Sequence, residues 1–142
     1  MAAVVIDASI ASAWCFPDEQ TDYTRAVFQA VVSSAVDAVA PGLWAYEVRN
    51  SVLMGIRRGR ISKPDGKQFL ISLNELNVRL TEPTSFDAVF SLAEEQGLTV
   101  YDAAYLDVAM QERLPLASLD GQLRRAAEKA VRTDSSSLSR AD

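Results

Sequence analysis

Apolar residues along the chain fall into two alternating patterns, and together these predict strands that alternate with helices. Short apolar runs rich in β-branched residues are typical of buried strands. Runs with apolar residues three and four positions apart are typical of amphipathic helices. The predicted strands cover residues 2–7, 37–41, 77–81 and 114–120, with a weak last strand near residues 130–133.

The predicted helices fill the segments between these strands. Proline, glycine and Ser/Thr-x-x-Asp motifs mark several of their ends, because prolines interrupt helices, glycines end them and hydroxyl side chains cap them. Three such motifs begin at Ser62, Thr84 and Thr99. The expected helices cover residues 10–16, 18–34 and 43–59, the segments that begin at the three motifs, and residues 121–128.

This order of elements indicates an α/β fold with a mostly parallel central sheet of four to five strands and helices on both faces. Functional groups in such folds collect beyond the carboxyl ends of the strands. The 142 residues suffice for one domain with its own core. We expect this domain at residues 1–134, followed by a flexible tail at residues 135–142.

The composition excludes several kinds of chemistry. The chain has no histidine and one cysteine, Cys15, which rules out a Ser-His-Asp or Cys-His nucleophile and a zinc site based on these residues. No phosphate-binding glycine motif occurs. The N-terminus lacks a signal-peptide pattern and no apolar run is long enough to span a membrane, so we expect a cytoplasmic protein. Carboxylates are the groups left for catalysis.

Two aspartates end apolar strands. Asp7 closes the run "VVID", and Asp120 closes "LASLD". Aspartate is a common helix N-cap, and either residue alone is accounted for in that way. Both caps would nevertheless lie at the same edge of the predicted sheet, so their carboxylates are expected to be close together.

Two further acids lie on helices that are rich in apolar residues. Asp102 shares the apolar stripe of "VYDAAYLDVA" and lies at the positive end of that helix, where a carboxylate stays ionised. Asp107 is about 140° further round the helix and is expected to face solvent. Glu47 shares a polar face with Asn50, although a lone helical glutamate is most often a surface residue.

Four carboxylates in one cleft would repel one another and raise their own pKa values. A bound cation offsets this repulsion. Oxygen ligands without histidine or cysteine select a hard ion, Mg²⁺ or Mn²⁺. These ions activate water and neutralise a phosphodiester. The four acids therefore predict a divalent-cation site suited to phosphodiester hydrolysis.

The basic residues are clustered, although the net charge is −5. Nine of the 14 lysines and arginines lie at residues 57–67 and 124–132. These clusters fit either two solvated helix ends or a surface that contacts nucleic acid. The candidates for binding RNA phosphates are Arg57, Arg58, Arg60, Arg124 and Arg125.

Four segments, in order, carry a family resemblance: "VVIDASIASAW", "PGLWAYEVRNSVL", "GLTVYDAAYLDVA" and "LPLASLD". Over about residues 1–134 the chain resembles the PIN-domain ribonucleases, and specifically the VapC toxins of bacterial type II toxin–antitoxin modules. The resemblance implies a PIN-like three-layer sandwich. Two departures are Asp107, where the family more usually has an apolar or small residue, and the short polar strand expected near residues 130–133.

The resemblance also implies a function and its partners. It implies a Mg²⁺- or Mn²⁺-dependent endoribonuclease that cleaves RNA, often tRNA or ribosomal RNA, and arrests translation. It implies a cytoplasmic homodimer, silenced by a cognate antitoxin whose C-terminal peptide reaches the acidic site. By this resemblance Asp7, Glu47, Asp102 and Asp120 are the metal-binding catalytic acids, and Ser9, Asn50 and Ser118 support them or contact the substrate.

Two other functions remain open from the residues alone. One is a phosphoryl-transfer enzyme with a strand-end aspartate as nucleophile, although "DAS" lacks the second acid of a D-x-D pattern and no strand-end lysine is present. The other is a non-catalytic interaction module whose acids only cap helices. A Mg²⁺ titration separates the second from a nuclease, because a metal that binds the folded state raises its melting temperature.

Overall fold

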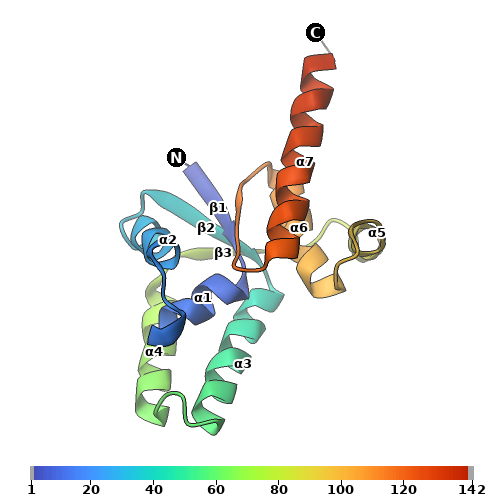
Figure 1. Cartoon of the computed structure of the whole chain (residues 1–142). Helices are drawn as coiled ribbons and strands as arrows, with labels where there is room; N and C mark the ends of the chain where they lie inside the picture. Colours follow the sequence, from blue (N-terminus) through green and yellow to red (C-terminus); the bar gives the residue numbers. More distant parts are fainter. Residues whose placement is uncertain (1, 141–142) are drawn as a thin grey trace.

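Four parallel strands form the central sheet of the protein (Figure 1). The structure, a computed structural model, describes the backbone of residues 2–140 and the side chains of residues 2–130. The strand order is β3-β2-β1-β4, and every pairing is parallel. The strands are β1 (Ala2–Ile6), β2 (Val36–Pro41), β3 (Val78–Thr81) and β4 (Leu116–Ala117).

Helices cover both sides of this sheet, so the predicted α/β sandwich is confirmed. The helix α6 packs on β1, β2 and β4 with α5 and α7 beside it, while α1 to α4 are grouped on the other side (Figure 1). No helix among residues 2–140 has the length and apolar character needed to cross a membrane. The helices are α1 (Ala8–Cys15), η1 (Pro17–Glu19, a 3₁₀ turn), α2 (Asp22–Val32), α3 (Leu43–Arg57), α4 (Lys63–Glu75), α5 (Phe86–Gln96), α6 (Val100–Glu112) and α7 (Gly121–Arg140).

The strand β1 lies inside the sheet and sets the position of the functional edge. Val5 and Ile6 are fully buried, as their apolar, β-branched side chains predict. Val5 pairs with Val39 of β2 on one side, and Ile6 pairs with Ala117 of β4 on the other. Since all strands are parallel, the chain leaves β1, β2 and β4 at one common edge.

The helix expected at residues 18–34 is divided into η1 and α2. Thr21 precedes α2 and forms a reciprocal cap with Thr24: its hydroxyl accepts from the Thr24 amide (3.2 Å), and the Thr24 hydroxyl accepts from the Thr21 amide (2.9 Å). Such a cap requires an extended backbone at its first residue, so the helix cannot begin before it.

Two of the three predicted helix starts are confirmed and one is wrong. The hydroxyls of Ser62 and Thr99 accept hydrogen bonds from the amides three residues later and cap α4 and α6. The cap of α5 is Ser85, not Thr84, and its hydroxyl accepts from the Ala88 amide (3.2 Å). Thr84 and Ser85 are adjacent and either type of residue can cap a helix, so the sequence could not decide which of them begins α5.

The last predicted strand, near residues 130–133, is wrong, because α7 runs through this segment without a break. The buried side chains of Leu123 and Ala127 continue toward residue 130 at helical spacing, so one apolar stripe joins the expected helix to the expected strand. The segment predicted as a tail begins at residue 135, and α7 includes it as far as residue 140. Residues 141–142 lie outside the described residues.

Candidate active site

Asp7 stands at the end of β1 and is fixed by three hydrogen bonds. Its side chain is buried, with 4% of the residue exposed. One carboxylate oxygen accepts from the Ile10 amide (3.1 Å), so Asp7 caps α1, and also from the Ser9 hydroxyl (2.6 Å). The other oxygen accepts from the hydroxyl of Ser118, which lies 111 residues later. Asp7 therefore connects the carboxyl ends of β1 and β4.

Asp120 belongs to the same hydrogen-bonded network. Its amide donates to the Ser118 hydroxyl (2.9 Å), and the neighbouring Leu119 amide donates to the Ser9 hydroxyl (3.0 Å). One carboxylate oxygen of Asp120 accepts from the Leu123 amide (2.9 Å) at the start of α7. Both strand-end aspartates thus make the hydrogen bonds of a helix cap, and both lie at one edge of the sheet.

Asp102 approaches this edge from the first turn of α6. Its amide donates to the Thr99 hydroxyl (3.0 Å), as the predicted cap requires. Burial raises the pKa of the Asp102 carboxyl, and the negative charges of Asp120 and Asp7 raise it further. The carboxylate of Asp102 therefore lies close enough to both strand-end aspartates to be repelled by them.

Glu47 completes the group from α3. Burial raises the pKa of its carboxyl, and the charges of Asp102 and Asp7 add to this shift. The Tyr105 hydroxyl donates a hydrogen bond to one Glu47 oxygen (2.7 Å), which opposes the shift by favouring the carboxylate. The charges of Asp7 and Asp102 thus act on Glu47, and those of Asp7 and Asp120 act on Asp102, which places the four acids in one region of the fold.

Tyr105 is part of this site, although the sequence interpretation assigned it only to the apolar stripe of α6. It is 2% exposed and lies three residues after Asp102, on the same side of the helix. Burial and the neighbouring Glu47 carboxylate raise the pKa of its hydroxyl, so the hydroxyl remains a donor at all relevant pH values. The three-residue spacing from Asp102 could have revealed this role from the sequence. A buried tyrosine hydroxyl usually has a hydrogen-bond partner, and this spacing directs it toward the acids.

The expectation that Asp107 faces solvent is wrong. Asp107 is 7% exposed, because α6 is covered by the sheet on one side and by α5 on another. Burial raises the pKa of its carboxyl, and a hydrogen bond with Gln111 opposes the shift. A helix that is apolar on most sides is buried on most sides, so an angle of 140° from Asp102 did not imply solvent.

The other predicted residues lie in separate places. Ser9 and Ser118 bind the acids, whereas Asn50 lines a neighbouring pocket between α1 and α3.

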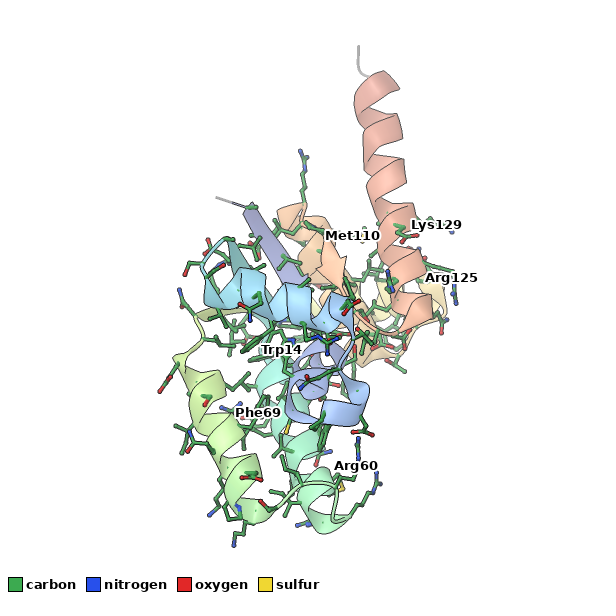
Figure 2. The ribbon with its side chains drawn as sticks, turned by 60° about the vertical axis from the view of Figure 1, so that its left-hand side comes forward. Trp14, Arg60, Phe69, Met110, Arg125 and Lys129 are labelled. Atoms are coloured by element: carbon green, nitrogen blue, oxygen red, sulfur yellow. The ribbon has the colours of Figure 1, made fainter. Side chains whose placement is uncertain are left out.

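The basic candidates fall into two clusters. Arg57 and Arg58 are exposed at the end of α3, and Arg60 follows them there. The second basic cluster begins α7, where Arg124 lies over the Tyr23 ring with 5.3 Å to its centroid. Figure 2 shows Arg60 and Arg125 in well-separated parts of the molecule.

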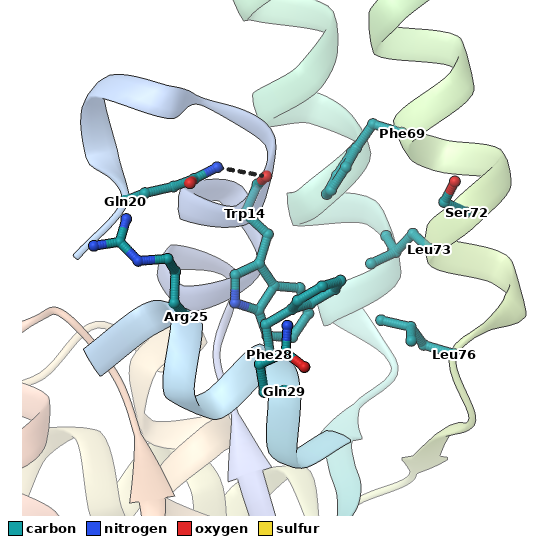
Figure 3. A pocket seen from close by; sticks show the side chains of 9 residues that line it. All are labelled: Trp14, Gln20, Arg25, Phe28, Gln29, Phe69, Ser72, Leu73 and Leu76. Atoms are coloured by element: carbon teal, nitrogen blue, oxygen red, sulfur yellow. Dashed lines mark hydrogen bonds between the residues drawn. The ribbon is translucent and has the colours of Figure 1, made fainter. Parts of the chain in front are cut away.

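A larger cavity lies away from the acids, between α1, α2 and α4 (Figure 3). It has a volume of about 390 Å³ and is lined mainly by apolar side chains. The Gln20 amide nitrogen donates to the Trp14 carbonyl at its margin (3.4 Å). No acid lines this cavity, so it is not the site of carboxylate chemistry. Its apolar lining residues are Trp14, Phe28, Phe69, Leu73 and Leu76.

Comparison with known proteins agrees with this geometry. A family model described as the PIN domain matches residues 4–129. The chain belongs to the PIN-domain family. Ribonuclease VapC3 of Pyrobaculum aerophilum is 37% identical over 125 residues, which cover 84% of this chain and 91% of that protein. The family resemblance found in the sequence, to a VapC-type PIN domain, is confirmed.

Two solved structures share the PIN-domain fold. PAE2754 from Pyrobaculum aerophilum has a TM-score of 0.69 at 23% identity, covering 94% of this chain and 96% of that chain. FitAcB from Neisseria gonorrhoeae has a TM-score of 0.60 at 16% identity, covering 88% and 93%. At these identities the two structures support the fold alone.

The acids of this PIN domain fit a hard cation by their chemistry. All four offer carboxylate oxygens, and mutual repulsion contributes to the raised pKa values of Glu47 and Asp102. A cation relieves such repulsion. As the side chains lie, no three Asp, Glu, His or Cys residues in the described part of the chain form a ready-made metal site.

The raised carboxyl pKa values predict how the stability of this PIN domain depends on pH. Folding favours the protonated forms of Asp7, Glu47, Asp102 and Asp107, so stability falls as the pH rises from the ordinary carboxyl pKa of about 4 through their raised folded-state pKa values. In metal-free buffer we expect the melting temperature to rise as the pH falls from neutral toward about 5. Thermal denaturation with a chelator at several pH values measures this.

Glu47→Gln provides the comparison for this prediction. It removes one of the titrating groups, so the dependence of the melting temperature on pH should become shallower than that of the wild type. An unchanged slope would show that Glu47 does not titrate in a buried, acid-rich environment.

Proposed function

We propose that this protein is a metal-dependent endoribonuclease and the toxin of a toxin–antitoxin pair. The observation that supports the proposal is a set of carboxylates linked pairwise near the carboxyl edge of a parallel sheet: Asp7 acts on Glu47 and Asp102, and Asp120 acts on Asp102. The chain is also 37% identical to Ribonuclease VapC3 over most of its length. Acid clusters of this kind suit the hydrolysis of a phosphodiester.

The four acids have different freedom to move. Asp7 is held by hydrogen bonds to both of its oxygens, so it provides a fixed ligand position. Glu47 is oriented through one oxygen by Tyr105. Asp120 is exposed and Asp102 is half-buried, so both can adjust toward a cation. When bound there, Mg²⁺ or Mn²⁺ would neutralise the scissile phosphate and activate water.

The partners are an RNA substrate, a second copy of the chain and a cognate antitoxin. A second copy is supported by exposed apolar side chains on α5 and α6, namely Phe86, Phe90 and Tyr101.

A peptide partner is supported by the apolar cavity of Figure 3, because Trp14 and Phe69 present a surface for its apolar side chains. We place this activity in the cytoplasm.

The proposal predicts that the purified protein cleaves RNA only with a divalent cation. Total RNA is incubated with the protein and Mg²⁺, Mn²⁺ or a chelator, and new 5′ ends are mapped. Cleavage at defined positions is expected with either metal, and none with the chelator. At a concentration of about 100 times its Kd, the metal should also stabilise the fold by about 2.7 kcal/mol.

The same measurements separate the other two functions. If the metal neither raises the melting temperature nor permits cleavage, the acids only cap helices and the protein is an interaction module. A phosphorylated Asp7 or Asp120, detected by mass spectrometry after incubation with a phosphoryl donor, would instead indicate phosphoryl transfer.

A further inference from the structure

We propose that the pocket between α1 and α3 binds a phosphate of the RNA strand next to the cleavage position. The inference rests on the proposed ribonuclease function and extends it from the acids to a neighbouring nucleotide. The pocket has a volume of about 230 Å³. The residues that line it include Ser12, Phe16, Asn50, Ser51, Arg58 and Arg60.

The first observation is an unsatisfied hydroxyl. Ser12 is 8% exposed, and its oxygen has no hydrogen-bond partner among the residues whose side chains are described. Ser9, one turn earlier on α1, uses its hydroxyl to bind Asp7. A buried hydroxyl without a partner costs free energy. The oxygen itself is covered in the free protein, but Ser12 lines a polar pocket, so a rotation of its side chain would present the free hydrogen to an acceptor on a ligand.

The second observation is the position of the pocket relative to the acids. The helices α1 and α3 both begin at the functional edge of the sheet. Ser12 is five residues beyond Asp7 on α1, and Asn50 is three residues beyond Glu47 on α3. One helical turn advances about 5.4 Å, so the pocket begins roughly one turn from the acids. A strand bound at the acids would reach it with a neighbouring nucleotide.

The third observation is the charge of the lining. Glu19 and Arg60 neutralise each other through an ion pair (3.2 Å). Arg58 also lines the pocket and is exposed, and it makes no ion pair within the described residues. Asp18 also pairs with Arg60 from outside the pocket (3.1 Å), so Arg58 is the guanidinium left without an ion-pair partner. An unpaired guanidinium beside two hydroxyls and an amide is a donor set for a phosphate.

The walls of the pocket are already in place. The Arg60 guanidinium lies 4.1 Å from the centroid of the Phe16 ring and is held there by Asp18 (3.1 Å) and Glu19. Gly55 lets the ring approach α3, because a Cβ atom at Gly55 would lie 2.5 Å from the Phe16 ring. A pocket formed before binding loses little entropy when the phosphate enters.

The test measures binding of a fluorescent single-stranded RNA oligonucleotide of fixed sequence, in chelator so that no cleavage occurs. Arg58→Gln should raise the Kd about 10-fold and lower the slope of log Kd against log salt by about 1. Ser12→Ala should raise the Kd about 3-fold. Lys67→Gln, an exposed cation in the same basic segment that does not line the pocket, should change the Kd by less than about 2-fold.

Neutral methylphosphonate linkages identify the phosphate concerned. Replacing one phosphate beside the cleavage position should weaken binding to the wild type, and the same replacement should have little effect on Arg58→Gln. Ser12→Ala should melt no lower than the wild type, because it removes an unpaired buried hydroxyl, so weaker binding would not reflect unfolding.

Two outcomes overturn the inference. One is that Arg58→Gln and Ser12→Ala bind the RNA as the wild type does, which would assign the pocket to another ligand, such as a carboxylate of a protein partner. The other is that Lys67→Gln weakens binding as much as Arg58→Gln, which would show only general charge attraction. If Arg58 governs RNA binding but the wild type cleaves no RNA with any metal, the ribonuclease proposal fails while the phosphate site stands.

Discussion

Asp7→Asn is expected to reduce the rate of RNA cleavage by more than about 10³-fold while the protein remains folded. Asp7 is the buried member of the acid group, and both of its oxygens are fixed by neighbouring donors. The substitution removes the charge that would hold a cation at this position, and the loss of several kcal/mol of electrostatic stabilisation corresponds to this rate effect. Cleavage of the RNA found in the mapping experiment measures it.

The fold should tolerate this change because an asparagine oxygen can still accept from the Ile10 amide and cap α1. The substitution also removes a carboxyl whose pKa is raised by burial, so the melting temperature at neutral pH should be no lower than that of the wild type. Asp87→Asn, in the exposed first turn of α5, is the matched control and should leave cleavage unchanged. Wild-type activity in Asp7→Asn would refute the assignment of the active site.

Tyr105→Phe is expected to lower the rate of cleavage about 10- to 100-fold and to raise the metal concentration that gives half-maximal activity. The substitution keeps the buried ring and removes only the hydroxyl that donates to Glu47 (2.7 Å). A hydrogen bond to a charged group contributes about 1.5–3 kcal/mol, which sets the size of the effect. Without it, the Glu47 carboxyl is less favoured in its ionised form and less well oriented for a cation.

The metal titration distinguishes a positioning role from a purely structural one. A structural defect would lower the melting temperature but leave the half-maximal metal concentration unchanged. Tyr46→Phe is the matched control, because Tyr46 is 80% exposed and makes no hydrogen bond to Glu47. If both variants behave alike, the hydrogen bond between Tyr105 and Glu47 has no part in activity.

The strands and the functional edge could be predicted because each has a strong local signal. Residues 2–7 form one uninterrupted apolar run that ends in Asp7, and the structure places β1 inside the sheet. The segment predicted as a strand at residues 114–120 is less regular, because β4 covers only Leu116–Ala117 and Asp120 follows it by three residues. Asp7 comes directly after its strand and is therefore marked by the change from apolar to polar residues.

Buried polar groups could not be predicted, since their environment depends on elements far away in the sequence. Asp107 was expected in solvent because of its angle on α6, but α6 packs against both the sheet and α5, and Asp107 is buried. Ser12 lies among apolar residues and shows no periodic signal of its own. Its role depends on α3, which reaches it only in the folded protein.

The segment near residues 130–133 shows a different kind of error. The sequence predicts a weak strand there, although the preceding apolar residues already follow a helical period that α7 continues. For a short polar segment, the periodicity of the flanking residues is the stronger guide.

The hydrogen bond between Asp7 and Ser118 joins residues 111 positions apart, near the two ends of the fold. During synthesis the first strand leaves the ribosome long before the segment that completes its surroundings. A nascent chain therefore carries Asp7 without Asp102, Asp120 or the Ser118 hydroxyl while about the next 95 residues are made. The acid cluster can form only after residue 120 has been made, so no shorter intermediate can possess the complete set of charges.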